Sequence, residues 1–81
     1  MQDSREVAIT KREREVLGLI AAGFSNDEVG RALFISPRTA KAHADALREK
    51  LGVARRRYLP AAYRAATGED PLTSPPPPGP T

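Results

Sequence analysis

The sequence contains no cysteine, so neither a disulfide nor a thiolate metal site can form within it. A single histidine is too few for a histidine-ligated metal site. The chain also lacks a glycine-rich phosphate loop and a nucleophile with a paired base. We therefore expect no enzyme activity, no metal and no cofactor.

Long hydrophobic runs are missing as well. No apolar stretch approaches the roughly eighteen residues that a membrane-spanning helix needs, and no signal-peptide pattern opens the chain. We therefore expect a cytoplasmic protein without a membrane partner. Eighty-one residues allow one small domain and leave little room for an enclosed active site.

Positive charge is present but unevenly distributed. Residues 1–35 hold five Lys and Arg against six Asp and Glu, whereas residues 36–68 hold eight against two. A basic half is expected of a surface that faces a polyanion. Ordinary solubility would also explain it.

Two capping boxes, Thr10-x-x-Glu13 and Ser25-x-x-Glu28, predict the starts of the first two helices. These helices are expected over residues 11–22 and 26–33. The charged cluster at residues 11–15 is interpreted as a solvated face with local ion pairs.

The stretch 36–52 predicts a third helix over about residues 37–51. Ser36 can cap its start, Pro37 suits the first helical position, and Gly52 accepts the left-handed conformation that ends a helix. Its apolar positions recur at steps of four, three and four residues, which places them on one face: Ala40, Ala44, Leu47 and Leu51. The opposite side carries Arg38, Lys41, Ala42, Asp45 and Glu49, with Arg48 on its flank.

The connection between the second and third predicted helices is short. It contains Phe34 and Ile35, and Ile35 is expected to fill the angle between the two helices. Gly30 fits the second helix if another element packs closely against it. This arrangement predicts a helix-turn-helix.

A fourth helix is expected to end near residue 66 or 67, with Gly68 as its stop. Pro60 conflicts with a regular start near Arg56, so a distorted or late start is favoured. Six prolines in residues 71–81 predict a disordered or polyproline II tail. The predicted fold is all-α and four-helix bundle-like, with a flexible segment 1–8, a domain 9–68 and a disordered tail 69–81.

With these elements placed, residues 9–53 resemble the LuxR/FixJ-type (GerE-like) helix-turn-helix domain of bacterial transcription regulators. The matching pieces are KREREVLGLIAAG (11–23), SNDEVG (25–30), LFISPRTAKAH (33–43) and KLGV (50–53). The resemblance implies a four-helix domain that binds double-stranded DNA, with the third helix in the major groove and the fourth helix pairing with its twin in a homodimer on DNA.

Transferred position by position, the resemblance implies that Lys41, Ala42 and Asp45 face the bases, although Asp45 is also spaced to pair with Lys41 and Arg48. It places Ser36, Arg38 and Thr39 at the start of the recognition helix, where phosphates are contacted. Arg48 is assigned to the DNA backbone too. Arg55, Arg56 and Arg57 either clamp the backbone or are solvated. The small apolar face available to a dimer helix comprises Leu59, Ala62, Tyr63 and Ala66.

Three departures from the family pattern matter. Ala40 stands where valine is usual, Asp45 where a basic or polar residue is common, and Arg55 where a small polar cap precedes the fourth helix. The first makes the core lighter and the second changes the base preference. The third, with Pro60 after it, weakens the dimer helix, so we expect a weak dimer that depends on DNA. Two interpretations remain: a sequence-specific, nucleoid-associated transcription regulator, or a protein-interaction module that contacts the transcription machinery, such as RNA polymerase, and binds DNA weakly or not at all.

Overall fold

The computed structural model describes residues 8–71. This part of the chain folds into α1 (Lys11–Ala21), α2 (Asn26–Leu33), α3 (Pro37–Leu51), the short 3₁₀ turn η1 (Arg56–Tyr58) and α4 (Leu59–Thr67), and it contains no strand. The all-α, helix-turn-helix prediction is therefore confirmed. Most of the predicted flexible N-terminus (1–7) and of the proline-rich tail (72–81) lies outside the described residues.

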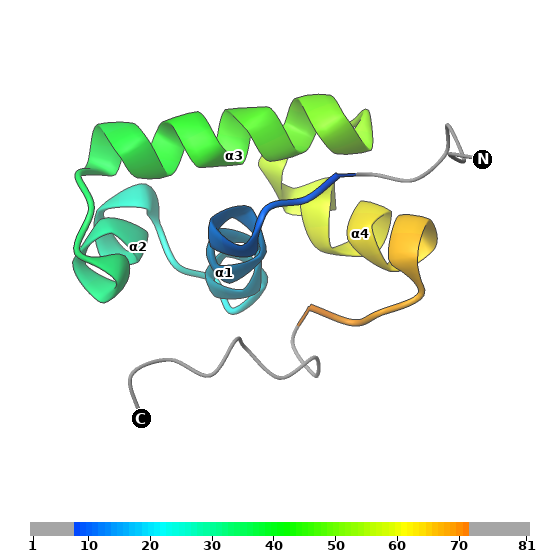
Figure 1. The fold of residues 1–81 in the computed structure, drawn as a ribbon, viewed down its shortest axis with the longest axis horizontal. Helices are drawn as coiled ribbons and strands as arrows, with labels where there is room; N and C mark the ends of the chain where they lie inside the picture. The colour runs from blue at the N-terminus through cyan, green and yellow to red at the C-terminus, as the bar shows by residue number, and fades with distance from the viewer. Residues whose placement is uncertain (1–7, 72–81) are drawn as a thin grey trace.

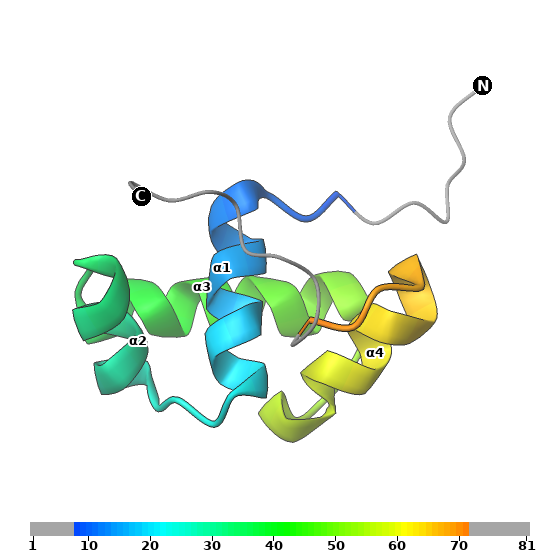
Figure 2. The same ribbon diagram turned by 90° about the horizontal axis from the view of Figure 1, so that it is seen from below.

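The longest helix, α3, forms one side of the domain, and the other three helices lie against its inner face (Figure 1). In the view from below, α1 crosses α3 near its middle, and α2 and α4 lie on opposite sides of α1 (Figure 2). This arrangement covers one face of α3 and leaves the opposite face uncovered by the other helices.

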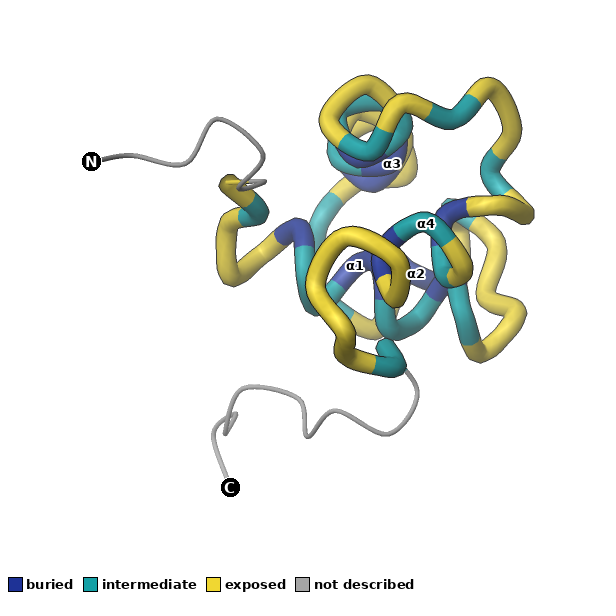
Figure 3. Tube along the Cα trace, turned by 90° about the vertical axis from the view of Figure 1, so that its right-hand side faces the viewer, coloured by how far each residue is buried: buried dark blue, intermediate teal, exposed yellow. Residues whose placement is uncertain are grey.

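The core lies between α3 and the other helices, where the dark blue buried segments gather (Figure 3). It consists of Val16, Leu17, Ile20, Val29, Ala40, Ala44, Leu47, Leu59 and Tyr63. The predicted apolar face of α3 is confirmed, because Ala40, Ala44 and Leu47 are buried and Leu51 packs half-buried against them.

Both predicted capping boxes are present. The Thr10 hydroxyl accepts from the Glu13 backbone N–H at 3.1 Å, and the Glu13 carboxylate accepts from the Thr10 N–H at 3.0 Å. The same pair of hydrogen bonds joins Ser25 and Glu28 at 3.2 and 2.8 Å. Because these contacts span only three residues, local sequence was enough to predict where α1 and α2 begin. Helix α1 ends at Ala21, one residue before the predicted end.

The prediction that the charged start of α1 is a solvated face is wrong for Glu13, which is buried. Its carboxylate is buried, with 6% of the residue exposed, and it accepts from Lys50 Nζ at 2.7 Å. Lys50 Nζ also donates to the Ala8 carbonyl at 2.8 Å. Burial raises the pKa of Glu13, but the hydrogen bonds from Lys50 and Thr10 outweigh it and hold the pKa below its ordinary value. This ion pair connects the start of α1 to the end of α3.

The turn between α2 and α3 is tight and depends on Gly30. A Cβ atom added to Gly30 would lie 2.6 Å from the Ile35 carbonyl oxygen, which is closer than real Cβ contacts allow. Ile35 packs half-buried against the core, as predicted. Phe34 ends α2 in the left-handed conformation (φ 59°) and is 94% exposed. That conformation is uncommon for a bulky residue.

The predicted late start of the fourth helix is also confirmed. Residues Arg56–Tyr58 form a 3₁₀ turn, and Pro60 falls in the first turn of α4, where its missing N–H removes no helical hydrogen bond. Beyond α4 the packing continues past the expected boundary at residue 68. Glu69 accepts from the Tyr63 hydroxyl at 2.9 Å and lies 3.6 Å from an Arg14 guanidinium nitrogen.

Candidate nucleic-acid interface

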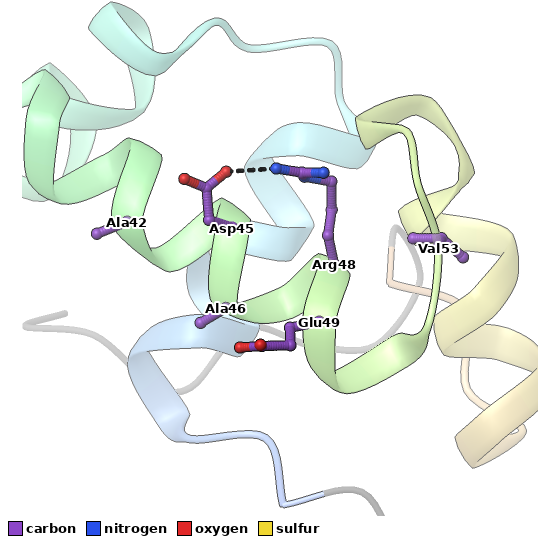
Figure 4. A pocket seen from close by; sticks show the side chains of 6 residues that line it. All are labelled: Ala42, Asp45, Ala46, Arg48, Glu49 and Val53. Atoms are coloured by element: carbon purple, nitrogen blue, oxygen red, sulfur yellow. Dashed lines mark hydrogen bonds and ion pairs between the residues drawn. The ribbon is translucent and has the colours of Figure 1, made fainter.

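The candidate site is the side of α3 that points away from the core, here called the outer face. Its residues are Arg38, Lys41, Ala42, Asp45 and Glu49, with Ala46 and Arg48 at its edges. Arg38, Lys41, Ala42 and Glu49 are exposed, and Asp45, Ala46 and Arg48 are half-buried. The small side chains of Ala42 and Ala46 leave the helix backbone close to the surface. Figure 4 shows the hollow that Ala42, Asp45, Ala46, Arg48, Glu49 and Val53 line.

The start of α3 is well defined. The Ser36 hydroxyl accepts from the Thr39 backbone N–H at 3.0 Å, and it donates to the Thr39 hydroxyl at 3.0 Å. Pro37 occupies the first turn, as the sequence predicts. Helix N-termini carry partial positive charge, and exposed hydroxyl groups and Arg38 lie beside this one. These groups together suit a phosphate.

Asp45 joins two cations on the outer face. One carboxylate oxygen accepts from Arg48 Nη2 at 2.8 Å, and the other accepts from Lys41 Nζ at 2.9 Å. The hydrogen bond from Arg48 and then the one from Lys41 hold the pKa of Asp45 below its ordinary value. The internal pairing that the spacing of these residues allows is therefore observed.

The three consecutive arginines occupy different environments. Arg56 donates to the side-chain oxygen of Asn26 and, at 2.7 Å, to the Phe24 carbonyl, so it ties η1 to the loop before α2. Burial lowers the pKa of its guanidinium. Arg57 lies over the Tyr58 ring, 5.2 Å from its centroid, and Arg55 and Arg57 are exposed. Arg56 thus has a structural role in this fold that the sequence did not reveal.

The four residues expected on the dimer helix are divided between two environments. Leu59 and Tyr63 are buried in the domain's own core. Ala62 is half-buried, and Ala66 is exposed. Only the two alanines of this set are therefore accessible to a second copy of the chain without rearrangement.

His43 lies half-buried at the edge of the packed face of α3. Across residues 8–71, no group of three side chains is suitably placed to hold a metal ion. No helix in this part of the chain is long and apolar enough to cross a membrane.

The structure thus contains a helix-turn-helix in which α3 is partly basic and is left uncovered on one side. Comparison with known proteins assigns the chain to a family. The profile of bacterial regulatory proteins of the luxR family matches residues 7–61, which is more than half of the chain. The chain belongs to this luxR family. The match includes α1, the helix-turn-helix, η1 and the start of α4, and it confirms the resemblance found in the sequence.

Two sets of relatives illustrate the membership. YhjB of Escherichia coli (strain K12), named as an HTH-type transcriptional regulator, is 49% identical over 49 residues. The match covers 60% of this chain and 24% of YhjB. The HTH-type transcriptional regulator MalT of Yersinia pestis (strain Pestoides F) and that of Yersinia pseudotuberculosis (serotype O:1b, strain IP 31758) are each 46% identical over 52 residues. These matches cover 64% of this chain and 6% of each MalT.

This luxR-family chain thus spans a quarter or less of the length of the curated relatives it matches. No solved structure gives a significant match. Membership supports DNA-binding regulation of transcription as the general function, in a family whose domain is typically non-enzymatic.

Proposed function

We propose that this chain is a sequence-specific, double-stranded DNA-binding domain of a transcription regulator, with α3 in the major groove. The observation that supports this most is the two-sided character of α3. One face is packed against the core through Ala40, Ala44 and Leu47, and no other helix of the described residues covers the outer face. An α-helix with one free face of small and charged residues fits the width of the major groove.

In this proposal the residues of α3 divide by role. Lys41, Ala42 and Asp45 face the base edges, because they occupy the middle of the outer face. Ser36, Arg38 and Thr39 contact phosphate at the helix start. Arg48 lies on the flank and adds a phosphate contact where its hydrogen bonds to Asp45 and Ala54 allow it. Arg55 and Arg57 are exposed and can add backbone contacts. Arg56 can do so only by giving up its hydrogen bonds to Asn26 and Phe24.

We also propose that two copies bind one DNA site as a homodimer, paired through α4. The accessible surface of α4 is small, so the pairing should depend on DNA. In this proposal the protein acts in the bacterial cytoplasm, bound to DNA of the nucleoid. Once bound to DNA, it can contact RNA polymerase.

One feature favours a second candidate function, a protein-interaction module with weak DNA binding. Asp45 and Glu49 place two acids on the outer face, and acids repel the phosphate backbone. This alternative would use the same face to contact a protein of the transcription machinery.

Salt dependence separates the two candidates. If the chain neutralises phosphates, the logarithm of its affinity for duplex DNA should fall linearly with the logarithm of salt concentration, with a slope of about −0.9 for each phosphate contacted. Four to six contacts per copy would give a slope of about −4 to −5. A slope near zero, or no measurable binding at low salt, would contradict the DNA-binding proposal.

A further inference from the structure

The outer face of α3 carries an acid at its centre. Asp45 lies between Lys41, one turn before it, and Arg48, one turn after it, and each cation has one carboxylate oxygen to itself. Figure 4 shows Asp45 and Arg48 joined at the edge of the hollow. The two cations on this part of the helix are therefore partly neutralised before any nucleic acid is bound.

Arg48 is held at a second point. Its Nη1 donates to the Ala54 carbonyl at 3.1 Å, in the loop that follows α3, while its Nη2 donates to Asp45. To reach a phosphate in another direction, the guanidinium would have to give up both hydrogen bonds. Lys41 is less restricted, because 65% of its side chain is exposed and Asp45 is its one hydrogen-bond acceptor among the described residues.

A carboxylate in this position affects the affinity for DNA in general and the affinity for one particular sequence differently. Cations provide nearly all of the sequence-independent affinity for DNA, so an acid that pairs with two of them lowers affinity for any sequence. In the major groove, however, a carboxylate can accept a hydrogen bond from the amino group of a base. The usual partner is the N4 amino group of cytosine. Each carboxylate oxygen has two lone pairs, so Asp45 can accept from a base while it still holds Lys41 and Arg48.

We propose that Asp45 is the specificity-determining residue of the outer face. It keeps Lys41 and Arg48 from the phosphates of non-cognate DNA, and it accepts a hydrogen bond from a cytosine amino group in the cognate site. At a site that presents guanine O6 and N7 or thymine O4 instead, these acceptor atoms repel the carboxylate. This inference rests on the proposed placement of α3 in the major groove.

The test compares Asp45→Asn with Glu49→Gln in the full chain. Both substitutions remove one negative charge from the wall of the same hollow and keep the side-chain size. Only Asp45 is paired with Lys41 and Arg48, since no ion pair involves Glu49 among the described residues. Affinities are measured for a duplex selected from a randomised pool by the wild-type chain and for a random duplex of equal length, over a range of salt concentrations.

For Asp45→Asn we expect affinity for the random duplex to rise about tenfold and the salt slope to steepen by about one to two, because Lys41 and Arg48 become free to contact phosphates. The ratio of selected to random affinity should fall at least about tenfold, and a new selection should lose its preference at one base pair. Glu49→Gln should raise both affinities by the same factor and keep the ratio.

Equal shifts in the two variants, with the ratio unchanged, would show that Asp45 acts only through its charge and would overturn this inference. A wild-type chain with no preference for any selected duplex would instead overturn the proposed function. Circular dichroism of both variants checks that the helices are kept, as the exposure of both side chains predicts.

Discussion

At Gly30, α2 lies directly against the backbone of the turn and of the first residue of α3. A Cβ atom at this position would contact backbone atoms of both Ile35 and Pro37, at 2.6 and 3.3 Å. Backbone atoms cannot rotate away as the end of a flexible side chain can, so the turn itself would have to move. Gly30 therefore determines how tightly the helix-turn-helix closes.

Gly30→Ala should lower the free energy of unfolding by about 1–3 kcal/mol, the usual cost of overpacking. Gly18→Ala is the matched control in α1, because its added Cβ would lie 3.7 Å from the Pro71 carbonyl oxygen, an ordinary contact. It should stabilise the chain by about 0.5–1 kcal/mol through helix propensity. Urea unfolding measures both values. A Gly30→Ala chain as stable as Gly18→Ala would show that the turn is looser than described.

Phe34 has a backbone conformation that its residue type does not predict. The sequence placed it correctly in a tight turn, but φ 59° is a conformation more typical of glycine or asparagine. Nothing in the residue type predicts it. The left-handed conformation follows from the short connection, because only three residues separate the end of α2 from the start of α3.

At the scale of the elements, the sequence was most informative where the contacts are local. The capping boxes, Pro37 and Gly52 act within one helical turn, and they placed α2 and α3 at the observed boundaries. The missed contacts join distant parts of the chain. Lys50 and Glu13 are 37 residues apart, and Arg56 and Asn26 are 30 residues apart. Such pairs depend on how the helices pack, which the spacing of one helix does not determine.

The Glu13–Lys50 ion pair should make the free energy of unfolding depend on pH. The pKa of Glu13 is lowered in the folded chain. Its contribution is therefore fully present above its unfolded pKa of about 4.5, and it is lost as the pH falls through the lower folded value. Glu13→Gln keeps the capping box but removes the charge, so it should cost about 1.5–3 kcal/mol near neutral pH. That difference should shrink as the pH falls below about 4.5, where wild-type Glu13 also becomes protonated.

Glu28→Gln is the control, because Glu28 forms the equivalent capping box and is exposed. It should change stability by less than about 0.5 kcal/mol near neutral pH. Unfolding curves between pH 3 and pH 7 give the comparison. Equal costs for the two variants would mean that Lys50 adds nothing to the fold.

At the scale of the whole molecule, the site could be predicted more fully than the assembly. The outer face follows from helical periodicity, which placed Ala40, Ala44 and Leu47 on the buried side of α3 and most of the charged residues on the exposed side. The surface for a second copy could not be predicted in the same way. Leu59 and Tyr63 have the apolar character of an interface residue, but the domain uses both in its own core. Periodicity cannot distinguish a face that packs within the chain from one that packs against a partner.

The free chain should sediment as an 8.8 kDa monomer at micromolar concentration. The accessible apolar residues of α4 are mostly alanines, so an interface there would fall in the small, transient class. On a duplex with two half-sites, two copies should bind cooperatively, because DNA aligns them and screens the arginines near η1. A stable dimer without DNA would contradict this prediction, as would non-cooperative binding to that duplex.

Lys41→Ala shows whether the outer face of α3 reads DNA sequence. The fold should survive, because Lys41 is exposed. Affinity for a selected duplex should fall by about 1–3 kcal/mol, the value of one base contact, and affinity for a random duplex should fall less. Lys11→Ala removes the same charge from an exposed position on α1, and it should leave the ratio of the two affinities unchanged. An equal loss on both duplexes for Lys41→Ala would reduce Lys41 to a phosphate contact and contradict sequence reading by the outer face.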